Sequence, residues 1–265
     1  MCLFYIRNGT VPIQNSRLIL VLLGCVIAYG QVCTAGTWVD DFSDRTLRDW
    51  GFIEKNDDWI AIVNNERFNF RGKNEDANFA LINWELGEIA DFTLEMKFML
   101  KHIGLKESGW RIGYEAWNEE KGEYEGFVEF IFDFDFGHHI LDPGIASVSI
   151  APSVPEEHPQ FGILWRPVSI ANGRFAYEKK VWYTLQIKAD GDRYTFSIDD
   201  LILEGKDDSV LIGRIRLHFY GRLSILLDDF IVTGPNVPNG GPGGLGVVMP
   251  AEKLATMWGK LKARN

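Results

Sequence analysis

Cysteine is scarce in this chain of 265 residues, and its three cysteines, Cys2, Cys25 and Cys33, all lie within the first 35 positions. The rest of the chain has no thiol, which excludes a disulfide framework, a zinc–cysteine site and cysteine catalysis from residues 36–265. Basic side chains are also in deficit, because 27 Lys and Arg face 37 Asp and Glu and leave a formal net charge of -10. Nucleic acids and anionic membranes need a basic surface, so neither is an expected partner.

Several catalytic motifs are absent as well. The chain contains no G-x-S-x-G, no H-E-x-x-H and no phosphate-binding glycine loop between a strand and a helix. No segment of its central region keeps a helical period over three turns. Hydrophobic residues nevertheless make up 46% of the chain, which is enough to build a core and excludes wholesale disorder.

The first 35 residues have the pattern of a signal peptide. Arg7 and Arg17 precede an apolar run of eleven residues, Leu18–Ala28, and small residues follow at positions 33–35 before a plausible cut. The run is too short to span a bilayer comfortably. A lipoprotein signal at Leu22–Cys25 and a buried strand or helix are the alternatives. Removal of residues 1–35 takes the net charge from -10 to -12, and we expect an exported bacterial chain without membrane insertion.

The region from Thr37 to Thr233 is expected to be one domain of short strands. Runs rich in Val, Ile, Thr and aromatic residues alternate there with turn residues. Asp190-Gly191 and Asp199-Asp200 each separate two such runs, which predicts tight hairpins. Many strands without helices indicate a sandwich or a barrel. The predicted strands are Thr37–Phe42, Trp59–Val63, Phe79–Ile82, Phe92–Leu100, Trp110–Trp117, Gly126–Phe136, Ala146–Ala151, Trp182–Ala189, Arg193–Ile198, Leu211–Tyr220 and Leu223–Thr233.

The composition changes at Gly234. Gly234–Gly246 contains six glycines and three prolines, and we expect residues 234–249 to be a linker. Residues 250–265 are expected to form a C-terminal amphipathic helix with one apolar stripe, made of Leu254, Met257, Trp258 and Leu261. From residue 247 onward the chain carries four basic residues and one acidic residue. A frayed terminal helix and a docking or sorting element for a surface partner are both open readings.

Motifs near the two ends of this domain carry a resemblance to a known superfamily. Trp38–Asp44 (WVDDFSD) stands at the start, and Val181–Arg193 (VWYTLQIKADGDR), Gly213–Leu217 (GRIRL) and Leu227–Val232 (LDDFIV) stand near the end. Their order resembles the concanavalin A-like lectin/glucanase superfamily, in particular bacterial laminin-G-like and 3-keto-disaccharide hydrolase domains. The resemblance covers about residues 37–233. It implies an all-β, concanavalin A-like jelly-roll sandwich of two antiparallel sheets in which the first and last strands pair.

The stretch Glu125–His139 carries the main functional prediction. Phenylalanines alternate there with other residues, so period two places four rings toward the core and three carboxylates on the outer face of the sheet. If this strand is central in a curved sheet, its outer face is the concave surface on which superfamily relatives hold sugars. The rings belong to Phe130, Phe132, Phe134 and Phe136, and the carboxylates to Glu129, Asp133 and Asp135.

The predicted strand Trp110–Trp117 is expected to border the same surface. Its outer face carries Arg111, Glu115 and Trp117, so an aromatic platform would stack on a sugar ring while the charged groups bind hydroxyls. The alternative for Trp117 is an edge residue covered by the following loop. We assign Trp59, Trp84 and Trp182 to the core. The proline-containing region Pro143–Gly173 is expected to be a long insertion near this surface.

The resemblance also implies a structural calcium ion between the first and last strands. Asp228 or Asp229 matches the position of the ligand in the last strand, and Asp40 or Asp41 lies nearby. Calcium prefers hard oxygen ligands, which this acidic chain has in excess. The alternative is that these carboxylates only cap the ends of strands.

These patterns lead to one hypothesis and two alternatives. The hypothesis is an exported, non-catalytic, lectin-like domain that binds carbohydrate or polysaccharide on its concave sheet face. The first alternative is a glycoside hydrolase that uses Glu129, Asp133 and Asp135 as acid and base. Retaining β-glucanases of the superfamily carry E-x-D-x-E, whereas this chain has Ile131 at the central position. The second alternative is a structural or adhesion module whose sheet face contacts a protein, with the acidic strand as a solvated surface.

Overall fold

The computed structural model describes residues 35–55, 58–104, 108–118, 123–136, 139–140, 144–158 and 162–243. All of them belong to the second of two compact units, which begins at Ala35. Residues 1–34 of the expected signal peptide and the expected C-terminal helix lie outside the described residues. Within the described ranges, no helix is long and apolar enough to cross a membrane.

Eight strands form one antiparallel sheet, here called the back sheet. Seven of them follow the spatial order β16–β15–β14–β6–β18–β4–β3, and β1 also pairs with β18. Their bounds are β1 Gly36–Asp40, β3 Trp59–Val63, β4 Phe68–Gly72, β6 Thr93–Ile103, β14 Trp182–Asp190, β15 Arg193–Ile198, β16 Leu201–Lys206 and β18 Leu223–Gly234.

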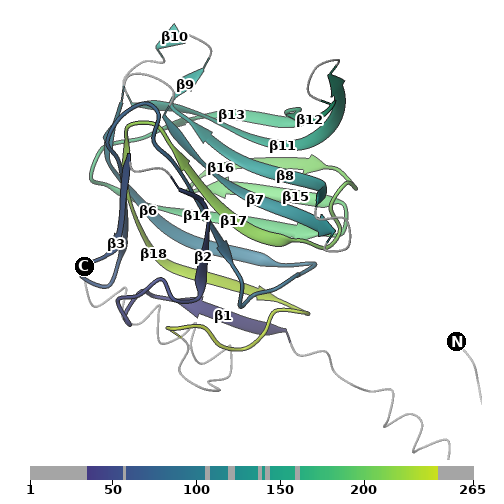
Figure 1. The fold of residues 1–265 in the computed structure, drawn as a ribbon, viewed down its shortest axis with the longest axis horizontal. Coiled ribbons are helices and arrows are strands. Elements are labelled where there is room, and N and C mark those ends of the chain that lie inside the picture. Colours follow the sequence, from purple (N-terminus) through teal and green to yellow (C-terminus); the bar gives the residue numbers. More distant parts are fainter. Residues whose placement is uncertain are drawn as a thin grey trace, which may run out of the picture. The chain divides into compact units, whose positions relative to one another are not determined.

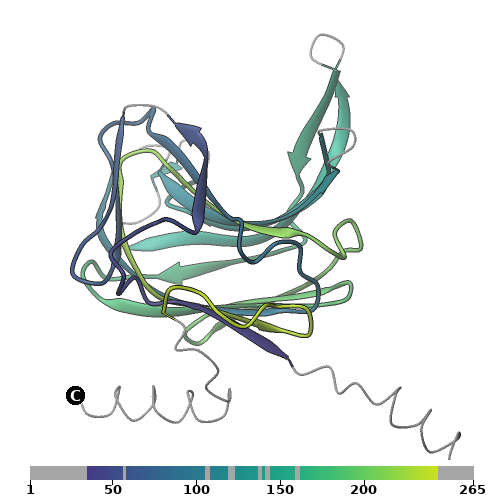
Figure 2. The ribbon, with the colours of Figure 1, turned by 60° about the horizontal axis from the view of Figure 1, so that its bottom comes forward.

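Eight further strands form the second antiparallel sheet, here called the concave sheet. Seven of them follow the order β12–β11–β8–β7–β17–β5–β2, and β13 pairs with β11 (Figure 1). Figure 2 shows that this sheet curls away from the back sheet, with the β11–β12 hairpin rising at one end. The bounds are β2 Trp50–Lys55, β5 Asn78–Asn83, β7 Gly109–Asn118, β8 Glu123–Asp133, β11 Ile145–His158, β12 Gly162–Pro167, β13 Ala171–Ala176 and β17 Arg214–Tyr220.

The predicted sandwich of two antiparallel sheets is therefore confirmed. The predicted pairing of the first and last strands is present too, because β1 runs antiparallel to β18 from Gly36 opposite Gly234 to Asp40 opposite Phe230. The chain then continues along β1, where the Val39 amide donates to the carbonyl of Gly240 at 3.0 Å. The described part of the segment expected to be a linker, residues 235–243, is thus packed on the sandwich.

Both predicted hairpins are present. Asp190 pairs with Arg193, which leaves a two-residue loop, and Gly191 supplies the positive φ of 59° that such a loop needs. In the next hairpin Ile198 pairs with Leu201. Local turn chemistry therefore sets the connections β14–β15–β16.

The core lies between the sheets and is rich in aromatic side chains. Phe130 and Phe132 of β8 are each 1% exposed, as period two predicts for the inward face. Rings from opposite sheets meet there, since Phe98 of β6 lies 5.3 Å from Trp110 of β7 and 5.4 Å from Phe132 between ring centroids. Burial of such rings supplies a large share of the hydrophobic stabilisation of a sandwich.

Several expectations from the sequence are corrected. The predicted strand Gly126–Phe136 breaks, because β8 ends at Asp133 and residues Asp135–Phe136 form β9, whose partner among the described strands is β10 (His139–Ile140). The Phe134 amide still donates to the carbonyl of Ser108 at 3.1 Å, which extends the register of β7 and β8 by one position beyond the pair Gly109 and Asp133, and the pairing with β7 ends there. The region from Pro143 to Gly173 is also not an insertion. Its described residues belong mainly to β11, β12 and β13 and extend the concave sheet.

The tryptophans divide differently from the prediction. Trp84 is 56% exposed, so its assignment to the core was wrong. Trp182 lies on the outer face of the back sheet beneath the guanidinium of Arg67, because its neighbour Tyr183 takes the inward position. Trp59 is partly buried and packs against Phe79 at 4.1 Å between ring centroids.

The carboxylate of Asp40 makes the stability of the sandwich depend on pH. It is fully buried at the end of β1 and accepts hydrogen bonds from Trp50 Nε1 and from the Phe42 amide, each at 2.8 Å. Burial nevertheless raises the pKa of Asp40 to about 6, from an ordinary 3.8. A folded-state pKa above the unfolded value gives stability that is present at low pH and is lost as the pH rises through about 6.

We expect the free energy of unfolding of the wild-type protein, relative to that of Asp40→Asn, to fall by about 3 kcal/mol between about pH 3 and pH 7. Chemical denaturation across this range measures the difference, and other titrating groups common to both proteins cancel. A difference that stays constant with pH would contradict the prediction.

Candidate functional site

The register of the concave sheet aligns side chains in rows that run across the strands. One row, here called the central row, crosses six strands and contains Gly51, Ile82, Arg216, Gly113, Glu129 and Ala151. Neighbouring strands lie about 4.8 Å apart, so side chains at adjacent positions of the row are close enough to contact each other. The side chains in this row project from the face turned away from the core, which is the concave face.

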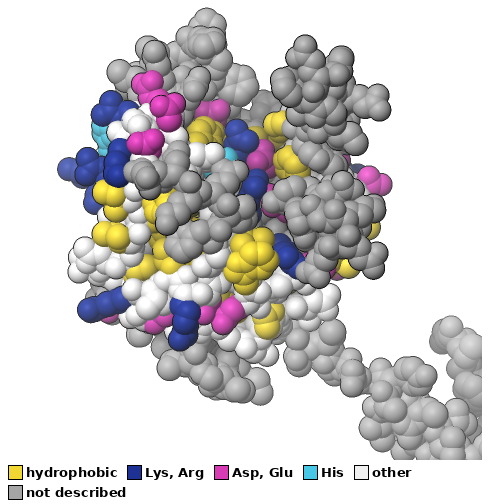
Figure 3. Space-filling view, viewed as in Figure 1, with side chains coloured by type: hydrophobic (Ala, Val, Ile, Leu, Met, Phe, Trp, Pro, Cys, Tyr) yellow, Lys and Arg dark blue, Asp and Glu magenta, His cyan; other side chains and the backbone are white. Residues whose placement is uncertain are grey.

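Four charged side chains meet on this face and are here called the ionic network. Arg216 of β17 contacts two carboxylates, Glu115 Oε1 at 2.7 Å through Nε and Glu129 Oε1 at 3.9 Å through Nη2. Arg111 of β7 donates from Nη1 to Glu129 Oε2 at 3.0 Å. Figure 3, which looks onto this face, shows basic, acidic and histidine side chains lying close together. Two positive and two negative charges therefore compensate one another.

The ionic network is held below the surface. The side chains of Glu115 and Glu129 are 2% and 3% exposed, and that of Arg216 is 14% exposed. Gly113 makes room for them, because a Cβ at this position would lie 2.9 Å from Glu115 Oε1. Charges this far from water are stable only when each has a partner, so the network fixes the geometry of the face.

Neutral polar groups border the ionic network. The Arg111 guanidinium lies over the ring of Tyr220, 5.0 Å from its centroid, and His218 Nε2 is hydrogen-bonded to Asn78 Oδ1. Burial, with Arg216 and Arg111 nearby, lowers the pKa of His218 to about 3. Burial and the charge of Asp133 raise the pKa of Tyr220. Imidazole and phenol are therefore both uncharged at neutral pH and serve as hydrogen-bonding groups.

The structure brings together some of the predicted site residues. Arg111, Glu115 and Glu129 lie in the ionic network, although they come from two strands. Asp133 projects from the same face of β8, but four residues from Glu129, which is about 13 Å along a strand. Glu115 and Glu129 instead share a contact with Arg216, which the sequence did not predict.

Two predicted site residues, Trp117 and Asp135, have side chains outside the described residues. The backbone changes the position of Asp135 only. Trp117 pairs with Tyr124 after a β-bulge whose extra residue, Glu125, lies on β8, so the bulge adds no residue to β7. Asp135 belongs to β9 and not to β8, so period two does not extend to it from Glu129.

Strand β17 was predicted, but its outward side chains were not recognised as part of the site. Its sequence from Arg214 to Tyr220, RIRLHFY, alternates perfectly and buries Ile215, Leu217 and Phe219. The period-two alternation that was applied to β8 also predicts that one face of this strand carries Arg214, Arg216, His218 and Tyr220. The local sequence pattern alone does not predict that β17 lies between β7 and β5.

Comparison with solved structures identifies the architecture. The κ-carrageenase from Pseudoalteromonas carrageenovora, in complex with an oligotetrasaccharide of κ-carrageenan, matches with a TM-score of 0.53 and 11% identity, over 76% of this chain and 94% of that chain. A Bacillus subtilis protein of unknown function with a galectin-like fold matches with a TM-score of 0.51 and 14% identity, over 76% and 96%. The chain has the concanavalin A-like jelly-roll fold.

A third jelly roll, the carbohydrate-binding module CBM66 from Bacillus subtilis, matches with a TM-score of 0.46 and 13% identity, over 70% of this chain and 96% of that chain. No protein-family model matches the sequence, and no curated protein matches it either. At 11% and 14% identity, the two matches with TM-scores of 0.53 and 0.51 establish the fold alone.

The residues expected to hold calcium in this jelly roll are bonded to protein groups. Asp40 accepts from Trp50 and Phe42, Asp228 lies 3.3 Å from Arg67 Nε, and Asp229 lies 2.6 Å from Lys97 Nζ. Among the described residues, no three Asp, Glu, His or Cys side chains are grouped so that they could hold a metal ion. These contacts do not favour a calcium site built from Asp40, Asp228 and Asp229, and the calcium ion between the first and last strands stays a prediction.

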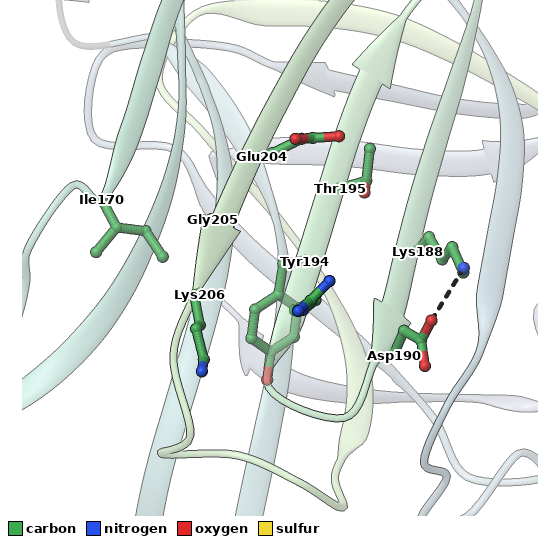
Figure 4. A pocket seen from close by; sticks show the side chains of 9 residues that line it. Ile170, Lys188, Asp190, Tyr194, Thr195, Glu204, Gly205 and Lys206 are labelled. Carbon is green, nitrogen blue, oxygen red and sulfur yellow. Dashed lines mark hydrogen bonds and ion pairs between the residues drawn. The ribbon is translucent and has the colours of Figure 1, made fainter.

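A shallow depression of about 670 Å³ lies on the other side of the jelly roll, over β14, β15 and β16 (Figure 4). Lys188 and Asp190 form an ion pair there at 3.1 Å, with side chains 53% and 66% exposed. Ion pairs this open to water contribute little free energy and do not fix a geometry. The concave face, with its buried and compensated charges, is therefore the better candidate site of the jelly roll.

The burial of the ionic network can be tested by removing one charge. We expect Glu129→Gln to lower the free energy of unfolding by about 3 kcal/mol, because it leaves Arg111 and Arg216 without their shared carboxylate. Glu88→Gln is the matched control, since Glu88 pairs with Arg214 at 3.6 Å but is 43% exposed. It should cost less than about 1 kcal/mol. Urea unfolding measures both, and equal losses would show that the network is not a buried unit.

Proposed function

We propose that this protein is an exported, non-catalytic module that binds carbohydrate on the concave face, with the ionic network at the centre of its site. The observation that carries the proposal is the convergence of two arginines and two glutamates over Gly113, on the outer face of the curved sheet. Export is supported by the signal-like pattern of the first 35 residues.

The chemistry of the concave face suits sugar hydroxyls. Each hydroxyl both donates and accepts a hydrogen bond, and the face offers both roles without a change of charge. Arg111 is 29% exposed and has five N–H donors, of which Nη1 contacts Glu129. Ser147 and Ser149 of β11 lie opposite Asp133 and Ile131 and add hydroxyl groups at the same face. A pre-ordered set of polar groups loses little entropy when a ligand binds.

The structural neighbours support the same ligand class. The κ-carrageenase is in complex with an oligotetrasaccharide of κ-carrageenan, and its fold matches this chain with a TM-score of 0.53. At 11% identity this likeness concerns the fold, so it supports a carbohydrate ligand without naming one.

Binding is favoured over hydrolysis by the state of the carboxylates. Glu115 and Glu129 are both nearly inaccessible and each contacts an arginine, so neither is placed to exchange a proton with a substrate. Glu129 and Asp133 lie about 13 Å apart along β8, which exceeds the separation of about 5 to 9.5 Å used by paired-carboxylate glycosidases. Ile131 stands between them.

Affinity electrophoresis and calorimetry of the full chain with laminarin, κ-carrageenan, xylan and soluble cellulose test the proposal. We expect at least one glycan to bind, and Arg111→Lys to weaken it about tenfold because a lysine lacks the planar fork. Arg67→Lys is the matched control. Arg67 also pairs with a carboxylate and covers an aromatic ring, but on the back sheet, and its replacement should leave binding unchanged.

Two outcomes would overturn the proposal. If no glycan is retained by the folded protein, carbohydrate binding is wrong. If reducing sugar is released from one of these glycans, and Glu129→Gln or Glu115→Gln abolishes the release, the protein is a hydrolase that uses this carboxylate pair. Unfolding curves of each variant show whether a loss of binding reflects a loss of fold.

A further inference from the structure

Trp84 occupies an unusual position on the concave side of the sheet. It follows β5 directly and is 56% exposed, which is a large apolar surface to leave in water. Its indole lies over β2, because a Cβ on Gly51 would come within 1.6 Å of Trp84 Nε1. Gly51 belongs to the central row, opposite Ile82, so Trp84 covers one end of the row that contains Arg216 and Glu129.

The surrounding residues hold this indole in place. The Arg214 guanidinium lies over its ring, 5.5 Å from the centroid, and is itself 3.6 Å from Glu88. The turn that carries Trp84 is anchored by Leu86, which is 3% exposed and whose amide donates to Asn83 Oδ1 at 3.0 Å. The ring is therefore pre-positioned by a cation, a tight turn and a glycine, while more than half of it faces solvent.

The distance from this ring to the ionic network suggests the size of the ligand. Gly51 and Gly113 are three strands apart in the central row, which is about 15 Å at ordinary strand spacing. The position between Gly51 and Arg216 is held by Ile82, which is 6% exposed and presents an apolar floor. A single sugar ring cannot reach from the indole to Arg216, whereas a short chain of rings laid across the strands can.

We propose that Trp84 is an aromatic platform on which one sugar ring stacks, and that the ligand is an oligosaccharide longer than a disaccharide, lying along the central row from Trp84 to the ionic network. Sugar rings carry an apolar C–H face that packs on an indole, while their hydroxyls point outward to polar groups. This inference rests on the proposed function, because it requires that the concave face binds carbohydrate.

Calorimetry with di- and hexasaccharides of laminarin and of κ-carrageenan tests the inference. For the wild-type protein, the hexasaccharide that binds should do so at least about tenfold more tightly than its disaccharide. Trp84→Ala should weaken hexasaccharide binding about tenfold and change disaccharide binding by less than about twofold. Trp84→Phe should restore most of the affinity, because phenylalanine keeps an aromatic face.

Trp182→Ala is the matched control, since Trp182 also lies beneath an arginine but on the back sheet, and it should leave both affinities unchanged. If Trp84→Ala binds the hexasaccharide like the wild type while Arg111→Lys does not, the platform is wrong and the binding face stands. Equal wild-type affinities for both lengths overturn the proposed ligand size. If neither series binds and the polysaccharides do not bind either, the proposed function and this inference fall together.

Discussion

The ionic network over Gly113 is the interaction on which the concave face depends. Arg111, Glu115, Glu129 and Arg216 come from three strands, and nearly buried carboxylates are tolerable only because a guanidinium meets each of them. The same register places Trp110, Phe132 and Phe219 in the core. A slip of one residue in β7, β8 or β17 would turn rings outward and charges inward, so the polar face and the aromatic core specify one another.

This mutual dependence explains why the candidate site is pre-ordered before any ligand arrives. Gly113 provides the space and the two arginines provide the charge compensation. Burial keeps His218 neutral by lowering its pKa to about 3 and keeps Tyr220 neutral by raising its pKa. A face whose groups hold constant charge and fixed position is suited to recognition through hydrogen bonds, and poorly suited to proton transfer.

Each sheet carries an arginine that contacts a carboxylate and covers an aromatic ring, but the two arginines differ in their surroundings. On the concave sheet Arg111 contacts Glu129 and covers Tyr220, and on the back sheet Arg67 contacts Asp228 and covers Trp182. The carboxylate is 3% exposed in the first case and 22% exposed in the second. Water screens the second pair more strongly, so its contribution to stability and geometry is smaller. Burial, and not the choice of residues, makes the concave face distinctive.

Much of the architecture follows from the sequence by itself. Period-two alternation determined which side chains of β7 and β8 face the core, turn residues determined two hairpins, and the end motifs indicated a sandwich closed by its first and last strands. Short strands such as β2, β4 and β13 were not predicted from the sequence, because their stability comes from pairing with neighbouring strands and not from local composition.

Only the tertiary structure decided which strands are neighbours and where alternation stops. Arg216 meets Glu115 and Glu129 because β17 inserts between β5 and β7, a pairing of segments far apart in the chain. The position of Trp84 depends likewise on a partner remote in sequence, since its indole lies over Gly51 of β2. Alternation is a local property of a strand, whereas register and neighbours are set by the packing of the whole sheet.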